Sequence, residues 1–165
     1  MSDDYMALQQ LIMAYAVAVD GRRIGLLQDI FAPDARVEIR MFGVWDRAGW
    51  IAHCKEELPK LDATSHFCAP PVVQVSGDIA RSRCLFVSQQ VLNELRPNPF
   101  LTIGGYYDDE FARVDGRWWI TGRTGTSCWW QGNPRVLGRD VPVGAIDWGE
   151  GHQTPAWVGD SLFWS

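Results

Sequence analysis

The chain has 165 residues, of which 47% are hydrophobic and 21% charged, the composition of an ordinary globular domain with a sizeable core. Its net charge of −5 argues against a nucleic-acid partner, because binding phosphates requires a clustered basic face. The N-terminus, MSDDYMALQQ, is acidic where a secretion signal is basic, and no apolar run is long enough to span a bilayer. We therefore expect a cytoplasmic protein that makes no membrane contact.

Cysteine and tryptophan usage narrows the class of protein further. Four cysteines stand at positions 54, 68, 84 and 128, without CxxC or zinc-type spacing, so we expect reduced, buried thiols and no metal site. Nine tryptophans are unusually many for this length, and five of them fall within the last 37 residues. They supply a pocket wall or a subunit interface, or they simply fill the core.

The first sixty residues are predicted to be mostly helical. The hydrophobic pattern indicates helices over 4–19, 24–31 and 46–58, and a strand over 36–42. Pro33 and Asp34 are expected to form a turn before that strand. Asp46 is expected to cap the third helix, which should end near Pro59.

From residue 64 the pattern changes to long β-strands. They are predicted over 65–77, 79–95, 100–116 and 117–132. Asp115-Gly116 is a strong hairpin signal between the last two, whereas Pro70-Pro71 cannot sit in a regular ladder and indicates a bulge or a sheet edge. We expect the domain to span residues 1–133. Residues 134–165 are expected to form an irregular, Trp-rich tail that packs on this domain or on a neighbouring subunit.

Helices followed by antiparallel strands predict an α+β domain. A strongly curved sheet capped by helices forms a cone, and its interior is a natural pocket for a small ligand. The aromatic candidates for the pocket wall are Phe42, Trp45, Trp50, Phe86, Trp119, Trp129 and Trp130. Such a wall suits a flat, largely apolar cyclic substrate with a carbonyl or hydroxyl group.

Asp20 raises a physical question, because it lies in the last predicted helical turn, before Gly21. A carboxylate there meets the negative end of the helix dipole, and if it is buried it needs a partner. His53 is expected at the surface of the third helix and His152 lies in the tail, so His66 is the candidate partner. A lone strand histidine is more often structural than catalytic, and spacing alone does not show that Asp20 and His66 meet.

Three stretches of the chain resemble the SnoaL-like branch of the nuclear-transport-factor-2-like superfamily, over roughly residues 4–133: LIMAYAVAVDGRRIGLLQDIFAPDARVEI, SHFCAPPVVQVSGDIARSRCLFV and GGYYDDEFARVDGRWWITGRTGTSCWWQGNP. The nearest enzyme families are scytalone dehydratase and hexachlorocyclohexane dehydrochlorinase. In both, an aspartate at the end of the first helix pairs with a histidine on the sheet, and Asp20 and His66 match them. The resemblance implies a cone-shaped α+β barrel, no cofactor, and a homodimer or homotrimer that packs through the outer face of the sheet.

The implied chemistry is acid–base catalysis. His66 would remove a proton from carbon, while Asp20 orients the imidazole and stabilises the imidazolium. This predicts a lyase or isomerase, of dehydratase, cyclase or isomerase type, acting on a polyketide, a terpenoid or steroid ketone, or a halogenated ring. One alternative is a small-molecule-binding protein without turnover. Another is the structural small subunit of a ring-hydroxylating dioxygenase, which lacks the aspartate–histidine pair.

Two polar residues are expected beside this pair. Tyr15 lies about one helical turn before Asp20 and shares its face. Gln89 stands about where scytalone dehydratase has a second pocket histidine. Glutamine can hydrogen-bond a substrate but cannot transfer a proton at neutral pH.

The last two strands supply further candidates. Strand alternation sends either Tyr106 or Tyr107 inward without saying which, and we take Tyr107 as the pocket candidate. The resemblance to the dehydrochlorinase implies a pocket arginine near the Asp115-Gly116 hairpin. Arg123 is the candidate for substrate binding, and Arg113 is expected on the solvated face of the sheet.

Overall fold

The computed structural model describes residues 2–40 and 42–138. The expectations for His152 and for the tail tryptophans therefore lie outside the described residues. In chain order the elements are α1 (Ser2–Asp20), the 3-10 helix η1 (Ile24–Asp29), β1 (Phe31–Ile39), β2 (Gly43–Asp46), α2 (Arg47–Glu57), η2 (Leu58–Lys60), β3 (Ala63–Cys68), β4 (Val72–Ser76), β5 (Ile79–Val91), η3 (Asn93–Leu95), β6 (Phe100–Val114), β7 (Arg117–Gly132) and η4 (Pro134–Leu137).

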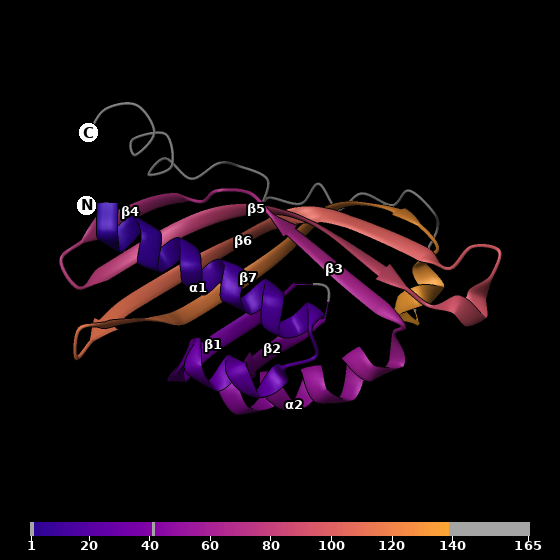
Figure 1. Cartoon of the computed structure of the whole chain (residues 1–165), viewed down its shortest axis with the longest axis horizontal. Helices are drawn as coiled ribbons and strands as arrows, with labels where there is room; N and C mark the ends of the chain where they lie inside the picture. Colours follow the sequence, from indigo (N-terminus) through magenta and orange to yellow (C-terminus); the bar gives the residue numbers. More distant parts are fainter. Residues whose placement is uncertain (1, 41, 139–165) are drawn as a thin grey trace.

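The strands form one curved sheet in the order β2-β1-β7-β6-β5-β3, and β4 also pairs with β5. Only the β1–β7 pair is parallel among the described strands. Figure 1 shows the long strands arching over α1 and α2, which lie on the same side of the sheet. The predicted α+β architecture is confirmed, and the core fills the space between the helices and the concave face, with the buried residues Leu8, Ile12, Leu27, Phe31, Val37 and Ile120.

Local signals explain several element boundaries. The side chain of Asp46 accepts a hydrogen bond from the backbone N–H of Gly49 at 2.7 Å, which confirms the predicted N-cap of α2. Asp115 and Gly116 both have positive φ, at 50° and 76°, as the predicted two-residue hairpin requires. Pro70-Pro71 divides the predicted first long strand into β3 and β4, both of which pair with β5.

The predictions were wrong near the start of the sheet. The turn expected at Pro33-Asp34 lies inside β1, whose register with β7 shifts between Phe31 and Arg36, so an irregular ladder accommodates the proline. The helix expected over 24–31 is a 3-10 helix ending at Asp29. The sequence analysis missed β2, which has only four residues.

Two irregularities in the pairing of β6 with β7 decide which side chains of β7 face inward. Glu110 pairs with Gly122 and Phe111 with Ile120, so Thr121 is an extra residue. Cys128 is likewise extra, because the pairing shifts between Gly104 and Gly105. Each extra residue reverses the alternation of the strand beyond it. The consequence is that Arg123, Gly125 and Ser127 belong to the concave side, whereas Trp129 does not.

Candidate active site

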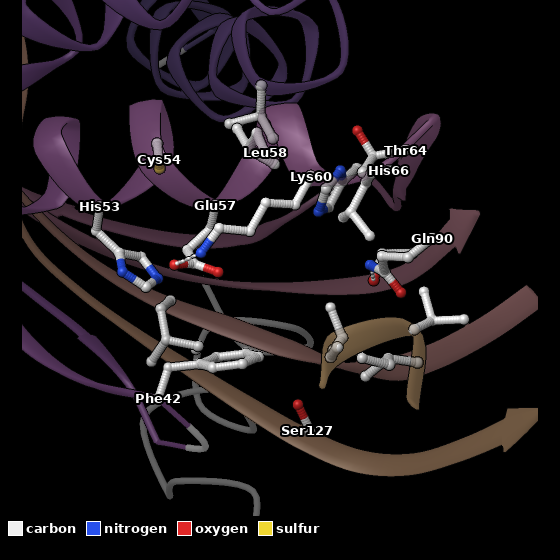
Figure 2. Close-up of a pocket in the computed structure, with 18 of the residues that line it drawn as sticks. Phe42, His53, Cys54, Glu57, Leu58, Lys60, Thr64, His66, Gln90 and Ser127 are labelled. Carbon is white, nitrogen blue, oxygen red and sulfur yellow. Dashed lines mark hydrogen bonds and ion pairs between the residues drawn. The ribbon is translucent and has the colours of Figure 1, made fainter. Parts of the chain in front are cut away.

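A cavity of about 740 Å³ opens on the concave side of the sheet. Strands β3, β5, β6 and β7 form its wall, with α1, α2 and η4 completing it. Figure 2 shows two groups of side chains within it: Thr64, His66 and Gln90 at one end, and Phe42, His53 and Glu57 at the other. We call the first group, together with Asp20 behind it, the polar end (Asp20, Thr64, His66, Ser88 and Gln90). We call the aromatic rings of the second group, together with Trp45 behind them, the aromatic end (Phe42, Trp45, Trp50 and His53).

Asp20 and His66 are in direct contact at the polar end. The Nδ1 atom of His66 lies 2.7 Å from Oδ1 of Asp20, and the backbone N–H of His66 donates to Oδ2 at 2.6 Å. Asp20 thus contacts both the ring and the backbone N–H of His66 on β3. Because Nδ1 is engaged, the proton-accepting nitrogen left for a molecule in the cavity is Nε2.

A second set of hydrogen bonds holds the carboxylate of Asp20 in place. The hydroxyl of Thr64 donates to Oδ1 of Asp20 at 3.0 Å, and it accepts from Nη1 of Arg22 at 2.6 Å. The same Nη1 donates to the carbonyl of Val19 at 3.1 Å, in the last turn of α1. A cation therefore lies at the carboxyl end of the helix, where it offsets the unfavourable position of Asp20.

The backbone at this helix end turns at an arginine. Arg22, not Gly21, adopts the left-handed conformation, with φ of 57°. Its amide N–H bonds the carbonyl of Val19 at 3.2 Å, and the N–H of Arg23 bonds the carbonyl of Ala18 at 2.8 Å. A non-glycine residue in this region is strained, and here the strain accompanies a guanidinium aimed at the site.

The electrostatics favour an ionised aspartate. Burial acts to raise the pKa of Asp20, but the hydrogen bonds and charge of His66, together with the Thr64 hydroxyl, outweigh it and leave the pKa below its usual range. At neutral pH the pair is therefore a carboxylate facing a ring N–H. In the neutral imidazole this arrangement places the proton on Nδ1 and leaves Nε2 as the acceptor, and it stabilises the imidazolium once a proton arrives.

Two tyrosines form the inner wall beside this pair. The ring of Tyr15 meets that of His66 edge-on, with 6.5 Å between centroids, and that of Tyr107, with 5.8 Å. Burial raises the pKa of both phenols well above the usual tyrosine value. Both hydroxyls therefore stay protonated and can donate hydrogen bonds to an oxygen in the cavity.

Arg123 lies behind the two tyrosines and does not line the cavity. Its Nε and Nη2 atoms bind both carboxylate oxygens of Asp109, at 2.6 and 2.7 Å, and the arginine is only 1% exposed. Its guanidinium lies 4.2 Å from the ring centroid of Tyr15 and 4.4 Å from that of Tyr107. Arg123 therefore supports the wall, and direct substrate contact was the wrong expectation for it. Arg113 is held by Asp4 and Asp78, so it is less solvated than expected.

At the aromatic end the structure corrects the expectation for His53. This histidine lines the cavity, and its ring stacks on Trp45 and Trp50, at centroid distances of 4.5 and 5.5 Å. The ring centroid of Phe42 lies 6.5 Å from that of His53, at the rim of the cavity. His53 follows Trp50 by three residues on α2, so helical spacing on the face marked by Trp50 and Cys54 could have revealed it.

The structure separates the predicted substrate contacts into two groups. Tyr15, Phe42, Trp50, Phe86 and Tyr107 line the cavity together with His66, whereas Trp45, Gln89, Trp119, Arg123 and Trp129 do not. Trp45 stands behind His53. Gln89 points to the outer face and bonds Thr102, because strand alternation brings Ser88 and Gln90 inward instead.

The two remaining tryptophans of the expected pocket wall, Trp119 and Trp129, both point away from the cavity. Trp118, not Trp119, is the buried member of its pair, and Trp119 stacks under the guanidinium of Arg117. Trp129 is turned outward by the extra residue Cys128, and its indole lies where a side chain on Gly104 would clash. The expected wall therefore holds for Trp50 but not for these two residues.

The described part of the chain holds no group of three or more histidine, cysteine or carboxylate side chains placed to bind a metal. None of the four cysteines forms a disulfide within this part of the chain; Cys54 and Cys84 are buried, while Cys68 and Cys128 are partly exposed. Among the described residues no helix is both long and apolar enough to cross a membrane.

Comparisons with known proteins identify the family of this chain. Residues 1–124 match the model of the SnoaL-like domain family. A Mycobacterium tuberculosis protein described as uncharacterized is 32% identical over 130 residues, which cover 76% of this chain and 86% of that protein.

Solved structures share the fold. A hexachlorocyclohexane dehydrochlorinase, LinA type 2, superposes with a TM-score of 0.73 at 24% identity, covering 79% of this chain and 89% of that one. A Novosphingobium aromaticivorans protein provisionally called a scytalone dehydratase gives 0.72 at 19% identity, covering 90% and 99%. A Salmonella enterica member of the nuclear-transport-factor-2-like superfamily gives 0.69 at 15%, covering 76% and 92%. The chain belongs to the SnoaL-like family and has the cone-shaped fold of the nuclear-transport-factor-2-like superfamily.

Proposed function

We propose that this protein is a cofactor-independent lyase or isomerase that acts on a small, largely apolar cyclic substrate. The observation that carries the proposal is the 2.7 Å contact between Asp20 and Nδ1 of His66, at the wall of a cavity that is partly lined by aromatic side chains. His66 is the general base and acid, and Asp20 orients it. A base held in this way contributes about 10²–10⁴ in rate.

The chemistry starts with Nε2 of His66 taking a proton from the carbon next to the substrate carbonyl. The electron pair of that C–H bond moves onto the carbonyl oxygen, to which Tyr15 or Tyr107 donates a hydrogen bond. In an elimination the pair then forms the carbon–carbon double bond and expels the group on the neighbouring carbon: a halide leaves as the anion, whereas a hydroxyl takes the proton from the imidazolium and leaves as water. In an isomerisation the imidazolium returns its proton to a different carbon. Asp20 balances the charge on the ring in both cases.

Two similarities support this proposal. The superposed dehydrochlorinase is named for an elimination, and the superposed dehydratase is provisionally named for another. Both share only the fold with this chain at the identities found, so the argument for catalysis rests on the aspartate–histidine geometry.

Deuterium exchange provides a test that needs no leaving group. 1-Tetralone in D₂O exchanges the C–H next to its carbonyl, and proton NMR follows the loss of signal with and without protein. We expect the wild type to accelerate this exchange, and both Asp20→Asn and His66→Gln to reduce the acceleration about 10²–10⁴-fold. Gln89→Leu, on the outer face, serves as the control and should exchange like the wild type.

The outcomes separate enzyme from binding protein. Tight ligand binding without exchange, unaffected by Asp20→Asn, would overturn the proposal and favour a carrier on the same scaffold. An exchange rate that is equal in the wild type and both dyad variants would overturn it as well.

We also propose a homodimer or homotrimer that packs through the outer face of the sheet. Apolar side chains cross the convex face in one row: Phe67 pairs with Val87 across β3 and β5, and Trp129 covers Gly104 next to Val87. Phe67 is 71% exposed in the single chain. Light scattering coupled to size exclusion should give two or three times 18.6 kDa, and Phe67→Lys should lower that mass. A wild-type monomer would contradict this proposal.

A further inference from the structure

Two buried polar side chains next to His66 play no part in the mechanism above. Ser88 is 3% exposed and Gln90 is 7% exposed, and both line the cavity. Across the ladder, Ser88 lies directly opposite His66 and Gln90 lies opposite Thr64. Directly opposed side chains of a sheet are close neighbours. Figure 2 shows Gln90 pointing into the space below Thr64 and His66.

The hydrogen bonds of these two residues are incomplete. Nε2 of Gln90 donates to Oγ of Ser88 at 3.0 Å, while Oε1 of Gln90 is buried without a partner among the described residues. Because the serine oxygen accepts from Gln90, its own O–H remains to donate. The pair therefore presents one acceptor, Oε1 of Gln90, and two donors, the serine O–H and the second amide N–H.

This result does not depend on how the amide is oriented. If the amide oxygen and nitrogen exchange places, Ser88 donates to the amide oxygen. Both amide N–H groups then become free donors, and the serine lone pair becomes the free acceptor. In both orientations the pair offers at least one donor and one acceptor to a molecule in the cavity. A buried amide left in this state is unfavourable until a bound molecule completes its hydrogen bonds.

We propose that Ser88 and Gln90 form a hydroxyl-binding subsite that selects hydroxylated cyclic substrates. A hydroxyl both donates and accepts, so it can bond the acceptor and a donor of the pair at once. A carbon-bound halogen has no proton to donate, and an ether or ketone can only accept. That the bound hydroxyl belongs to a substrate rests on the proposed function, whereas the binding preference does not.

The position of the subsite adds to this inference. Since Ser88 opposes His66 across the ladder, a hydroxyl held there lies near the His66 side chain. The substrate class that fits is a cyclic ketone with a hydroxyl near the acidic C–H. Among the eliminations open to the site, the subsite favours loss of water over loss of halide.

Three bicyclic probes test the subsite without turnover. 2-Naphthol donates and accepts, 2-methoxynaphthalene only accepts, and 2-methylnaphthalene does neither, while all three have similar shape. Their dissociation constants are measured by NMR titration on the wild type and on Gln90→Met, which keeps the side-chain length. We expect the wild type to bind 2-naphthol roughly tenfold or more tightly than either of the other probes.

Variants of Gln90 and Ser88 test whether these two residues cause the preference for 2-naphthol. Gln90→Met should bind the three probes within about threefold of one another, and Ser88→Ala should lose part of the preference. Gln89→Met makes the same chemical change on the outer face and should leave the preference intact. Equal wild-type affinities, or a 2-naphthol preference that survives both Gln90→Met and Ser88→Ala, would overturn the subsite.

This test is independent of catalysis. A naphthol preference that depends on Gln90, in a protein that does not accelerate exchange of 1-tetralone, would retain the subsite and reject the proposed enzyme. Exchange that depends on Asp20 and His66, without a naphthol preference, would retain the enzyme and reject the subsite.

Discussion

The two ends of the cavity each contain a histidine, and the neighbours of the two rings differ in kind. His66 is fixed through Nδ1 by a carboxylate that Thr64 and Arg22 support. His53 is stacked on Trp45 and Trp50, so its ring adds to a flat aromatic surface. The same side chain is thus arranged for proton transfer at one end and for contact with an apolar ring at the other. The partner, more than the residue type, determines what each histidine can do.

The largest expected effect separates the two histidines directly. His66→Gln should lower the acceleration of deuterium exchange about 10²–10⁴-fold, because glutamine cannot take a proton. His53→Gln should leave the rate at saturating 1-tetralone near that of the wild type and should weaken binding by less than about tenfold, since it removes one stacking surface. Similar losses of rate in both variants would break the distinction between the ends.

A second change tests the support beneath the polar end. Arg123→Met leaves Asp109 buried without its partner, which should lower the free energy of unfolding by about 3–5 kcal/mol. Arg113→Met removes a partly exposed arginine from Asp4 and Asp78 and should cost only about 1 kcal/mol. Urea denaturation of the two variants measures the difference. Equal losses would mean that Arg123 is not the buried anchor of the tyrosine wall.

A third change tests the hydrogen bond that the hydroxyl of Thr64 donates to the carboxylate of Asp20. Thr64→Val removes the hydroxyl that donates to Asp20, and we expect the exchange rate to fall roughly three- to tenfold. Thr64→Ser keeps the hydroxyl and should retain most of the rate, although both variants lose a similar amount of local packing. If the serine variant is as slow as the valine variant, packing and not hydrogen bonding explains the effect.

The smallest expected effect is on the stability of the fold at acidic pH. The folded-state pKa of Asp20 lies below the value of about 3.9 expected in the unfolded chain. Its ionisation therefore stabilises the fold above about pH 4, and this contribution is lost as the pH falls through the lower folded-state pKa. Asp20→Asn should flatten the loss of stability as the pH falls below about 4, and His53→Gln should not. Thermal unfolding across this range makes the comparison.

The sequence was informative where residue spacing or a local motif determines the answer. The helix cap at Asp46, the Asp115-Gly116 hairpin and the α+β order of elements were all predicted from local patterns. The meeting of Asp20 and His66, 46 residues apart, depended on a family resemblance, because spacing alone does not bring a helix end to a strand.

Several errors in the candidate site came from strand alternation. Neighbouring residues of one type, such as Gln89 and Gln90 or Trp118 and Trp119, leave the inward member undetermined until the register is known. The extra residue Cys128 then reversed the expected direction of Trp129. The orphaned amide of Gln90 could not be foreseen, because it follows from packing against Ser88 and not from any motif.

The central claim is that Asp20 holds His66 with Nδ1 protonated and Nε2 free. Nitrogen-15 NMR of the histidine rings, at a pH where the imidazole is neutral, reads this tautomer directly, and His66→Gln assigns the signal. We predict the Nδ1–H form for His66 in the wild type and a shift toward the Nε2–H form in Asp20→Asn, whose amide N–H donates to Nδ1 instead. An Nε2–H tautomer in the wild type, or a ring that does not respond to the loss of Asp20, would contradict the account.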